Sequence, residues 1–431
     1  MRILLACEFY YPSVGGVQEV IRQLAERLVE HGHRVTVATS YLPERRFREL
    51  NGVSIKEFRI FGNLVHGMKG EIEAYQTYVL EDRFDVLMIK AAQQWTFDAL
   101  IPVLHSITKP KIFIPCGFSS FYEPEYQGYY RQMPDALRKF DHLIFYASDY
   151  RDIDFARDHG MSNYTIVPNG ASEREFRSPA DHGFRQRHGI PENAFVLLTV
   201  GSQTGQKGHR EVAEAFEIAR FSDRPAVLIL NGNRTGFLQK VTAIWRAFGV
   251  TRVIKWIIRT SLIRLNLGWV LRIMGYSVQV PMSLDMLVSR INRAGASKRA
   301  MLVNLPRVEL VQAYLNSDLF VFASNIEYSP LVLYEAAAAS LPFLSLPVGN
   351  AEEIARWTGG GEICPAVNDA KGYTRVDPVV LAEHIMRLAG DSERLSHLGT
   401  MGRRNWEEQF SWDKIAMLYE KIFERCVQQS D

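Results

Sequence analysis

The chain has 431 residues, of which 47% are hydrophobic and 23% are charged, and its formal net charge is +2. These values are typical of a folded soluble protein, and the length predicts two or three domains. A net charge this close to zero favours no class of partner. The sequence has four scattered cysteines without a CxxC pair, which favours free thiols in a reducing compartment over a zinc site.

The first residues, MRILLACEFYYP, do not resemble a signal peptide, because Glu8 interrupts an apolar run of only five residues, 3–7. We find no stretch of 18 uncharged apolar residues that would span a membrane. We therefore expect a cytoplasmic protein, which can still lie on the inner face of the membrane.

The first half of the chain alternates apolar strands with helices. Strands are predicted at 3–7 and 34–40, with a helix from Val17 to His31 between them, because its apolar residues recur at helical spacing. This strand–helix–strand order predicts a parallel sheet. Further strands are predicted in FDVLMIK, KIFIPCG, HLIFYAS and YTIVPNG. We expect a doubly wound domain over residues 1–180.

The pattern restarts after a connector, FRQRHGIPENA. Strands predicted in FVLLTVG, AVLILNGN, AMLVNLP and LFVFASN alternate with helices in a second domain, residues 181–404. The fold class is therefore α/β with two doubly wound halves. Ligands of such sheets bind at the carboxyl ends of the strands, so a cleft between the halves is the expected site.

A basic and apolar insert, about 235–295, interrupts the second domain. Residues 224–284 contain nine Arg or Lys and no Asp or Glu. If 252–259 is helical, its cations share one face and its aliphatic side chains the other, which is typical of a helix lying on a membrane. We therefore predict contact between residues 235–275 and an anionic membrane. The alternative is a cap packed on the second domain, and nucleic acid is not favoured.

Two glycine-rich turns each follow a predicted strand and open a helix. In SVGGV, Gly15 and Gly16 allow close approach of the backbone to an anion, although a simple turn explains the pattern equally well. In VGSQTGQKGHR, Lys207 adds a positive charge that suits a phosphate. The alternative for Lys207 is a solvated loop lysine.

Two carboxylates stand eight residues apart after the strand LFVFASN. Glu327 precedes a helix that Pro330 is suited to open, and Glu335 lies inside that helix. Both can accept hydrogen bonds from sugar hydroxyls, form the acid/base pair of a glycosidase, or interact with the helix dipole. A third acidic segment, Asp152–Asp154, matches DxD, but it lies in a helical stretch and we interpret it as a solvated helix face.

These stretches, taken in order, resemble the family-4 retaining glycosyltransferases over nearly the whole chain. The resemblance rests on MRILLACEFYYPSVGGVQEVIRQLAERLVEHGHRVTVAT, IVPNGASEREF, VGSQTGQKGHREVAEAF, the E-x7-E segment with LPFLSLPVGNAEEI, and FSWDKIAMLYEKIF. It implies the GT-B fold, in which two Rossmann-like domains face a cleft. Residues 1–180 would form the acceptor side and 181–404 the nucleotide-sugar side. The terminal helix, within 405–431, would pack back on the first domain.

The resemblance also implies a metal-independent transfer of a sugar from a nucleotide diphosphate donor, with no cofactor. Lys207 would stabilise the departing diphosphate, Glu327 would lie near the anomeric centre, and Glu335 would hold the ribose hydroxyls. The implied catalytic residues are Glu327 and Lys207, and the implied donor-binding residues are Gly15, Gly16, Lys207, Ser329, Leu331 and Glu335. The expected acceptor is a lipid-linked or cell-surface glycan.

Three positions depart from the family pattern. Ser202 stands near the place of an arginine that binds phosphate, Tyr328-Ser329-Pro330 replaces a Gly-Phe-Gly, and Cys116 replaces a histidine of the first domain. Two alternatives therefore stay open. One is a nucleotide-sugar epimerase or hydrolase of the same fold, and the other is a non-catalytic, membrane-peripheral partner of a transferase.

Overall fold

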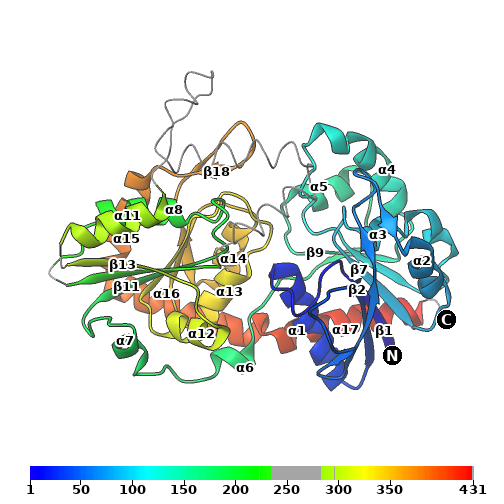
Figure 1. Ribbon diagram of the computed structural model, residues 1–431, viewed down its shortest axis with the longest axis horizontal. Helices are drawn as coiled ribbons and strands as arrows, with labels where there is room; N and C mark the ends of the chain where they lie inside the picture. The colour runs from blue at the N-terminus through cyan, green and yellow to red at the C-terminus, as the bar shows by residue number, and fades with distance from the viewer. Residues whose placement is uncertain (223, 234–282, 296, 430–431) are drawn as a thin grey trace.

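The computed structural model describes residues 1–222, 224–233, 283–295 and 297–429. Two α/β domains lie side by side, each built on its own sheet (Figure 1). The first sheet has eight strands and the second has six. The predicted fold class, two doubly wound Rossmann-like domains, is confirmed.

The first sheet has the order β10-β9-β8-β7-β1-β2-β4-β3. The edge pair β3–β4 is antiparallel and the other pairs are parallel. The strands are β1 (Arg2–Ala6), β2 (Arg34–Ser40), β3 (Glu49–Leu50), β4 (Val53–Phe58), β7 (Val86–Lys90), β8 (Lys111–Ile114), β9 (His142–Phe145) and β10 (Tyr164–Ile166); β5 (Ile60–Phe61) and β6 (Lys69–Gly70) form a separate hairpin. Side chains on both faces of the central strands are buried, which explains why the strands are continuous apolar runs in the sequence.

Helices cover this sheet on both faces. The first, α1 (Gly16–Glu30), agrees with its prediction to one residue at each end, and it buries Val20, Ile21, Leu24 and Leu28 against the sheet. The others are α2 (Ile72–Leu80), α3 (Trp95–Asp98), η1 (Ile101–Ser106), η2 (Pro124–Tyr126), α4 (Gln127–Leu137) and α5 (Arg151–Asp158).

The second sheet is parallel throughout, in the order β13-β12-β11-β14-β15-β16. Its strands are β11 (Phe195–Val200), β12 (Ala226–Asn231), β13 (Lys298–Val303), β14 (Leu319–Phe322), β15 (Phe343–Ser345) and β16 (Gly361–Ile363), with a hairpin of β17 (Val367–Asn368) and β18 (Thr374–Arg375). Its helices are α8 (His209–Ile218), α11 (Leu284–Arg293), α12 (Arg307–Leu315), α13 (Leu331–Ala338), α14 (Ala351–Thr358), α15 (Pro378–Ala389) and α16 (Ser392–Asn405), and the connector holds α6 (Glu173–Phe176) and α7 (Phe184–Arg187).

The order of the second sheet reverses at β11, which lies between β12 on one side and β14 on the other. The loops that follow β11 and β14, residues 201–208 and 323–330, therefore flank the point where the winding changes direction, which we call the switch point. Ligands of open parallel sheets bind in the crevice at such a point. Lys207 of the glycine-rich motif and Glu327, the first acid of the E-x7-E motif, lie in these two loops, whereas Glu335 lies in α13.

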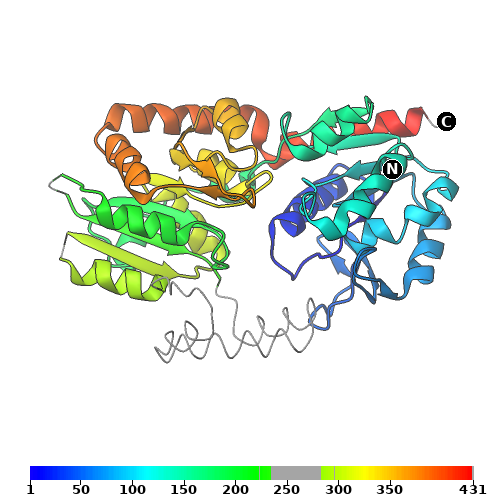
Figure 2. The same ribbon diagram turned by 90° about the horizontal axis from the view of Figure 1, so that it is seen from above.

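The end of the chain returns from the second domain to the first, as Figure 2 shows from above. The predicted single helix is instead two. Asn405 ends α16, a π-helical turn follows (Trp406–Phe410), and Ser411 has extended backbone and begins α17 (Trp412–Gln428). Helix α17 packs against α1 and buries its apolar stripe in the core of the first domain.

The predicted insert is only partly described. Its proposed membrane-contacting residues 235–275, including the predicted helix 252–259, lie outside the described residues. The described end, residues 283–295, contains α11, whose Leu287 and Ile291 are buried against the second sheet. Within the described parts of the chain, no helix is both long and apolar enough to cross a membrane.

Candidate functional site

Two helix N-termini, one from each domain, face each other between the sheets. Gly16 begins α1 and Leu331 begins α13. A Cβ added to Gly16 would lie 4.0 Å from Leu331 Cδ1, and Leu331 also packs against the core of the first domain. The glycine turn of Gly15 and Gly16 is thus opposite the helix that follows Glu327. Amide groups at such N-termini are suited to an anion.

Lys207 and Glu327 form an ion pair at the switch point of the second sheet. Lys207 Nζ lies 2.5 Å from Glu327 Oε1, which also accepts a hydrogen bond of 3.1 Å from the Ser324 hydroxyl. The side chains of Lys207 and Glu327 are 28% and 17% exposed, so both are shielded but accessible. The structure therefore brings together the two residues that the sequence predicts as catalytic.

The glycine-rich loop 201–208 is held against the loop after β14. The backbone carbonyl of Gln206 accepts a bond of 2.8 Å from Asn325 N and one of 3.2 Å from Ser324 Oγ. Gly208 has φ +72°, and a Cβ there would lie 2.0 Å from the carbonyl oxygen of Ala323. Only glycine fits this left-handed, tightly packed position, which places Lys207 beside Glu327.

Glu335 lies apart from this pair. Its carboxylate, with the side chain 11% exposed, lies 2.6 Å from Arg307 Nη2. Arg307, the first residue of α12, also contacts Glu175 at 2.7 Å. Direct contact of Glu335 with Lys207 or Glu327 is not observed among the described residues. The sequence did not predict Arg307 as the partner of Glu335, because its position after β13 is the only signal that the sequence offers.

The loop between the two acids also contacts the first domain. Asn169 Nδ2 donates to the carbonyl of Ser329 at 3.2 Å, and the Tyr150 hydroxyl donates to the carbonyl of Glu327 at 2.7 Å. Ser329 is therefore placed at the boundary of the domains. The contributions of Asn169 and Tyr150 were not predicted from the sequence, because both lie in a different domain from the motif they contact.

A carboxyl group at the end of β1 is a further residue that sequence reasoning missed. Burial raises the pKa of Glu8 to about 7, and the nearby Asp98 adds to the shift. Glu8 lies two residues after the end of β1 and precedes the turn of Gly15 and Gly16. Its position at the carboxyl end of a central strand is where substrate groups are expected.

The interpretation of Asp152–Asp154 as a solvated helix face is wrong for Asp152. Asp154 pairs with Arg157 on the surface, but Asp152 is fully buried and accepts a 2.7 Å bond from Gly117 N. Because α5 packs its first turn against the loop after β8, Asp152 points inward. Within the described ranges, no group of three or more His, Cys, Asp or Glu is placed to hold a metal ion.

The burial of Asp152 predicts a pH effect on stability. Burial raises its pKa to about 6 from an ordinary 3.8, so the folded state binds the proton more tightly than the unfolded state. The unfolding free energy should therefore fall as the pH rises from 4 to 7, by up to about 3 kcal/mol. Asp152→Asn should remove this slope in urea unfolding, whereas Asp154→Asn, on the same helix, should keep it. Equal slopes in both variants would contradict the assignment.

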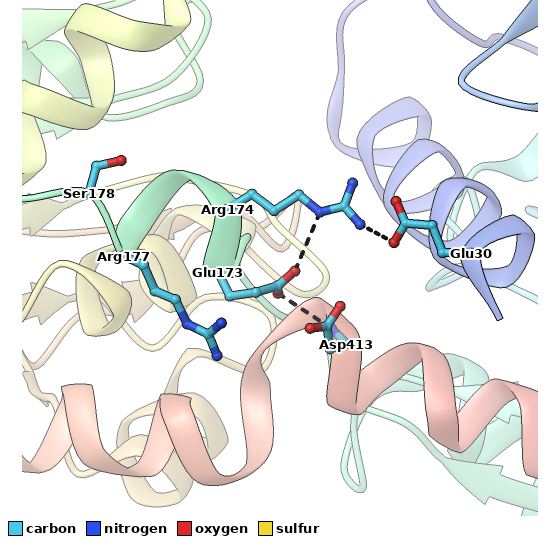
Figure 3. A pocket seen from close by; sticks show the side chains of 6 residues that line it. All are labelled: Glu30, Glu173, Arg174, Arg177, Ser178 and Asp413. Atoms are coloured by element: carbon cyan, nitrogen blue, oxygen red, sulfur yellow. Dashed lines mark hydrogen bonds and ion pairs between the residues drawn. The ribbon is translucent and has the colours of Figure 1, made fainter.

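A charged hollow of about 460 Å³ lies at the hinge between the domains and is lined by none of the predicted site residues. Figure 3 shows Arg174 between Glu30 of α1 and Glu173 of α6. The amide of Asp413, in α17, donates to Glu173 at 3.4 Å. Three segments that are distant in the sequence meet here, so the hollow belongs to the hinge rather than to the switch point.

Comparison with protein families identifies the chain. The model described as "Glycosyltransferase Family 4" matches residues 14–174, and the model described as "Glycosyl transferases group 1" matches residues 249–403. Together they take in more than half of the chain. It belongs to the family-4 glycosyltransferases. The predicted family and the predicted enzyme class are both confirmed.

Relatives of this glycosyltransferase align along its whole length. N-acetyl-alpha-D-glucosaminyl L-malate synthase of Bacillus anthracis is 22% identical, over 98% of this chain and 96% of the relative. Sucrose-phosphate synthase of Thermosynechococcus elongatus superposes with a TM-score of 0.67 at 16% identity, covering 98% of both chains. HepE of Anabaena, solved in complex with UDP, has a TM-score of 0.66 at 15% identity, covering 99% of this chain and 100% of its own. At these identities the structures support the GT-B fold alone.

Proposed function

We propose that this glycosyltransferase moves a sugar from a nucleotide diphosphate donor to an acceptor hydroxyl with retention of configuration. The ion pair of Lys207 and Glu327 carries the proposal. It lies between the glycine-rich loop and the N-terminus of α13, at the switch point of the second sheet. HepE has been solved with UDP and with UDP-glucose, which makes uridine diphosphate the first nucleotide to test.

The difficult charge in such a transfer develops on the departing diphosphate. In the proposed mechanism, Lys207 leaves Glu327 and binds the diphosphate, while amides at the first turns of α1 and α13 contact the remaining oxygens. Fixed donors of this kind are strongest in a closed site with little water. The proposed route needs neither a cofactor nor a divalent metal, because Lys207 and the amides supply the stabilising charge.

The released carboxylate of Glu327 would then accept hydrogen bonds from hydroxyls of the donor sugar near its anomeric centre. The Ser324 hydroxyl, which already donates to Glu327 Oε1, would keep the carboxylate oriented toward the sugar. Glu335 would accept hydrogen bonds from the ribose diol, with Arg307 holding it from the other side. The two acids thus take separate parts of one donor, which agrees with their lack of direct contact.

The acceptor in this proposal is a lipid-linked or cell-surface glycan, and the enzyme works at the inner face of the membrane. The support is compositional: residues 224–284 contain nine cations, many aliphatic side chains and no acid. Each cation near an anionic surface contributes ~1 kcal/mol to membrane affinity. Flotation with vesicles of phosphatidylserine and phosphatidylcholine should show salt-sensitive binding. Failure to float at low salt would remove the membrane from the proposal.

The donor proposal predicts a loss of nucleotide affinity in a single variant. Calorimetric titration with UDP should show about tenfold weaker binding to Glu335→Gln, because the neutral amide is a weaker acceptor for the ribose hydroxyls. A thermal-shift screen of nucleotide sugars would select the donor, since a ligand at 100 times its Kd stabilises by about 2.7 kcal/mol. Glu383→Gln, at an exposed position of α15 in the same domain, is the matched control. Equal UDP affinity in both variants would contradict the ribose assignment.

A further inference from the structure

The loop that carries Glu327 is fixed largely by residues of the opposite domain. Residues 327–330, called here the 327–330 loop, are the last part of the connection from β14 to α13 in the second domain. Tyr150 of the first domain donates its hydroxyl to the Glu327 carbonyl at 2.7 Å, and in turn accepts a 2.6 Å bond from Arg151 Nη2. Between the bonded carbonyls of Glu327 and Ser329 lies Tyr328. Its side chain points out of its own domain.

Tyr328 fits into a socket of the first domain, formed by Tyr146, Tyr150 and Gly117. The Tyr328 hydroxyl accepts a 3.0 Å bond from Tyr146 N. Its ring centroid lies 4.8 Å from that of Tyr150 and 5.5 Å from that of Tyr146. Through these contacts, Tyr328 packs against the core of the first domain.

The socket depends on a residue without a side chain. Gly117 has φ +83°, and a Cβ there would lie 2.8 Å from Tyr328 Cγ. The buried carboxylate of Asp152 holds the Gly117 amide at 2.7 Å and so fixes this backbone. Cys116, directly before it, packs against the same core cluster as Tyr328. The small Cys116 and the large Tyr328 are two departures from the family pattern that meet in one place.

A second segment of the second domain holds the same socket. Asn350 Nδ2 donates to the Tyr146 carbonyl at 2.9 Å, while Asn350 N donates to the Tyr328 carbonyl at 2.8 Å. Glu353 accepts a 3.0 Å bond from Ser148 N. The start of α14 and the 327–330 loop therefore contact residues 146–150 together, so separating the domains would break both sets of contacts at once.

The geometry points to Tyr328 as a positioning residue that couples closure of the two domains to the orientation of Glu327. In the closed arrangement, the socket fixes the backbone of Glu327 and Tyr328, through the Tyr150 bond to the Glu327 carbonyl and through the packing of the Tyr328 ring. When the domains separate to admit a donor, Tyr328 leaves the socket and that support is lost. The proposed nucleotide-binding residues Lys207 and Glu335 both lie in the second domain, and the amides of α1 are proposed to act on the departing diphosphate only in the closed arrangement. Nucleotide binding to the open enzyme therefore does not need the socket. This inference rests on the proposed position of Glu327 near the reacting sugar.

Kinetics of two variants test the coupling. Tyr328→Phe removes only the hydroxyl and should lower kcat about five- to tenfold, and Tyr328→Gly empties the socket and should lower it at least about 100-fold. The Kd for UDP should stay within about twofold of the wild type, because Lys207 and Glu335 are unchanged. Tyr122→Phe, a tyrosine of the first domain that is 77% exposed, should match the wild type in every measurement. The assay uses the nucleotide sugar selected by the thermal-shift screen.

Solution scattering adds a measurement that needs no substrate. Without ligand, Tyr328→Gly should have a larger radius of gyration than the wild type, because the socket no longer holds the domains together. If Tyr328→Gly does not fold, as judged by calorimetry, Tyr328→Phe decides the question. The inference would be overturned if kcat stayed within threefold of the wild type in Tyr328→Gly, or in Tyr328→Phe where Tyr328→Gly does not fold. A UDP affinity that falls in proportion to kcat would overturn it as well. An unchanged radius of gyration in folded Tyr328→Gly would do so as well.

Comparison with Glu327→Gln separates this inference from the proposed function. An active Glu327→Gln would contradict the proposed role of Glu327 itself. An inactive Glu327→Gln together with a fully active Tyr328→Gly would contradict the coupling alone. Both variants therefore belong in the same series of assays.

Discussion

Replacing Lys207 with alanine should lower kcat by about 10²- to 10³-fold while leaving the protein folded, because a fixed donor to developing negative charge contributes an effect of this size. The Lys207 ammonium lies 2.5 Å from Glu327 and is 28% exposed, so its removal leaves an acid in the site where a phosphate is proposed to bind. Nucleotide affinity should fall as well, because the diphosphate loses its nearest cation. Steady-state kinetics and calorimetric titration with UDP measure the two effects separately.

The control for this variant is Lys139→Ala, since Lys139 is an exposed lysine of the first domain, far from the switch point in the fold. It should keep the kcat of the wild type. Thermal unfolding should show that Lys207→Ala folds normally, because its ion pair is accessible to water and contributes little to stability. Full turnover by Lys207→Ala would contradict the proposal that Lys207 stabilises the departing diphosphate.

The pair of Lys207 and Glu327 could be predicted from sequence because both follow apolar strands that end at the same edge of a parallel sheet. Local patterns are sufficient for this: an apolar run predicts the strand, and a glycine-rich turn or Pro330 predicts the loop and the helix that follow. The same reasoning predicted α1 to within one residue at each end and predicted β1, β2, β7, β8, β9 and β10 in their order, but it missed β4 (Val53–Phe58). It needs no knowledge of how the two domains meet.

The residues that sequence reasoning missed are those whose role depends on contacts between distant segments. Arg307 meets Glu335 because α12 and α13 are neighbours in space, and no spacing in the sequence relates the two residues. Asp152 was misinterpreted because a helix in isolation gives no indication that its first turn will be buried under the loop of Gly117. Tyr328 was recognised as a departure from the family pattern, but its socket in the other domain is visible only in the structure.

Replacing Arg27 with methionine should destabilise the protein by about 3–5 kcal/mol, because it breaks a buried ion pair and leaves Glu173 with only the longer contacts to Arg174 at 3.9 Å and to the Asp413 amide at 3.4 Å. The Arg27 side chain is 1% exposed and contacts Glu173, which lines the hinge hollow of Figure 3. Its guanidinium contacts Glu173 of α6, and its Nε donates to Asp413 of α17 at 2.9 Å. One side chain of α1 thus joins the connector and the terminal helix, the two segments that pass between the domains.

A double variant shows whether the loss comes from the unpaired charge. Arg27→Met/Glu173→Gln should recover part of the stability lost in Arg27→Met, because replacing both partners removes the buried carboxylate that has lost its nearest cation. Arg34→Met, at an exposed position of the first domain, should change the unfolding free energy by less than about 0.5 kcal/mol. Urea unfolding followed by tryptophan fluorescence measures all three. A loss below 1 kcal/mol in Arg27→Met, or no recovery in the double variant, would contradict the role of the Arg27–Glu173 pair and would mean that water or Arg174 compensates Glu173 at the hinge.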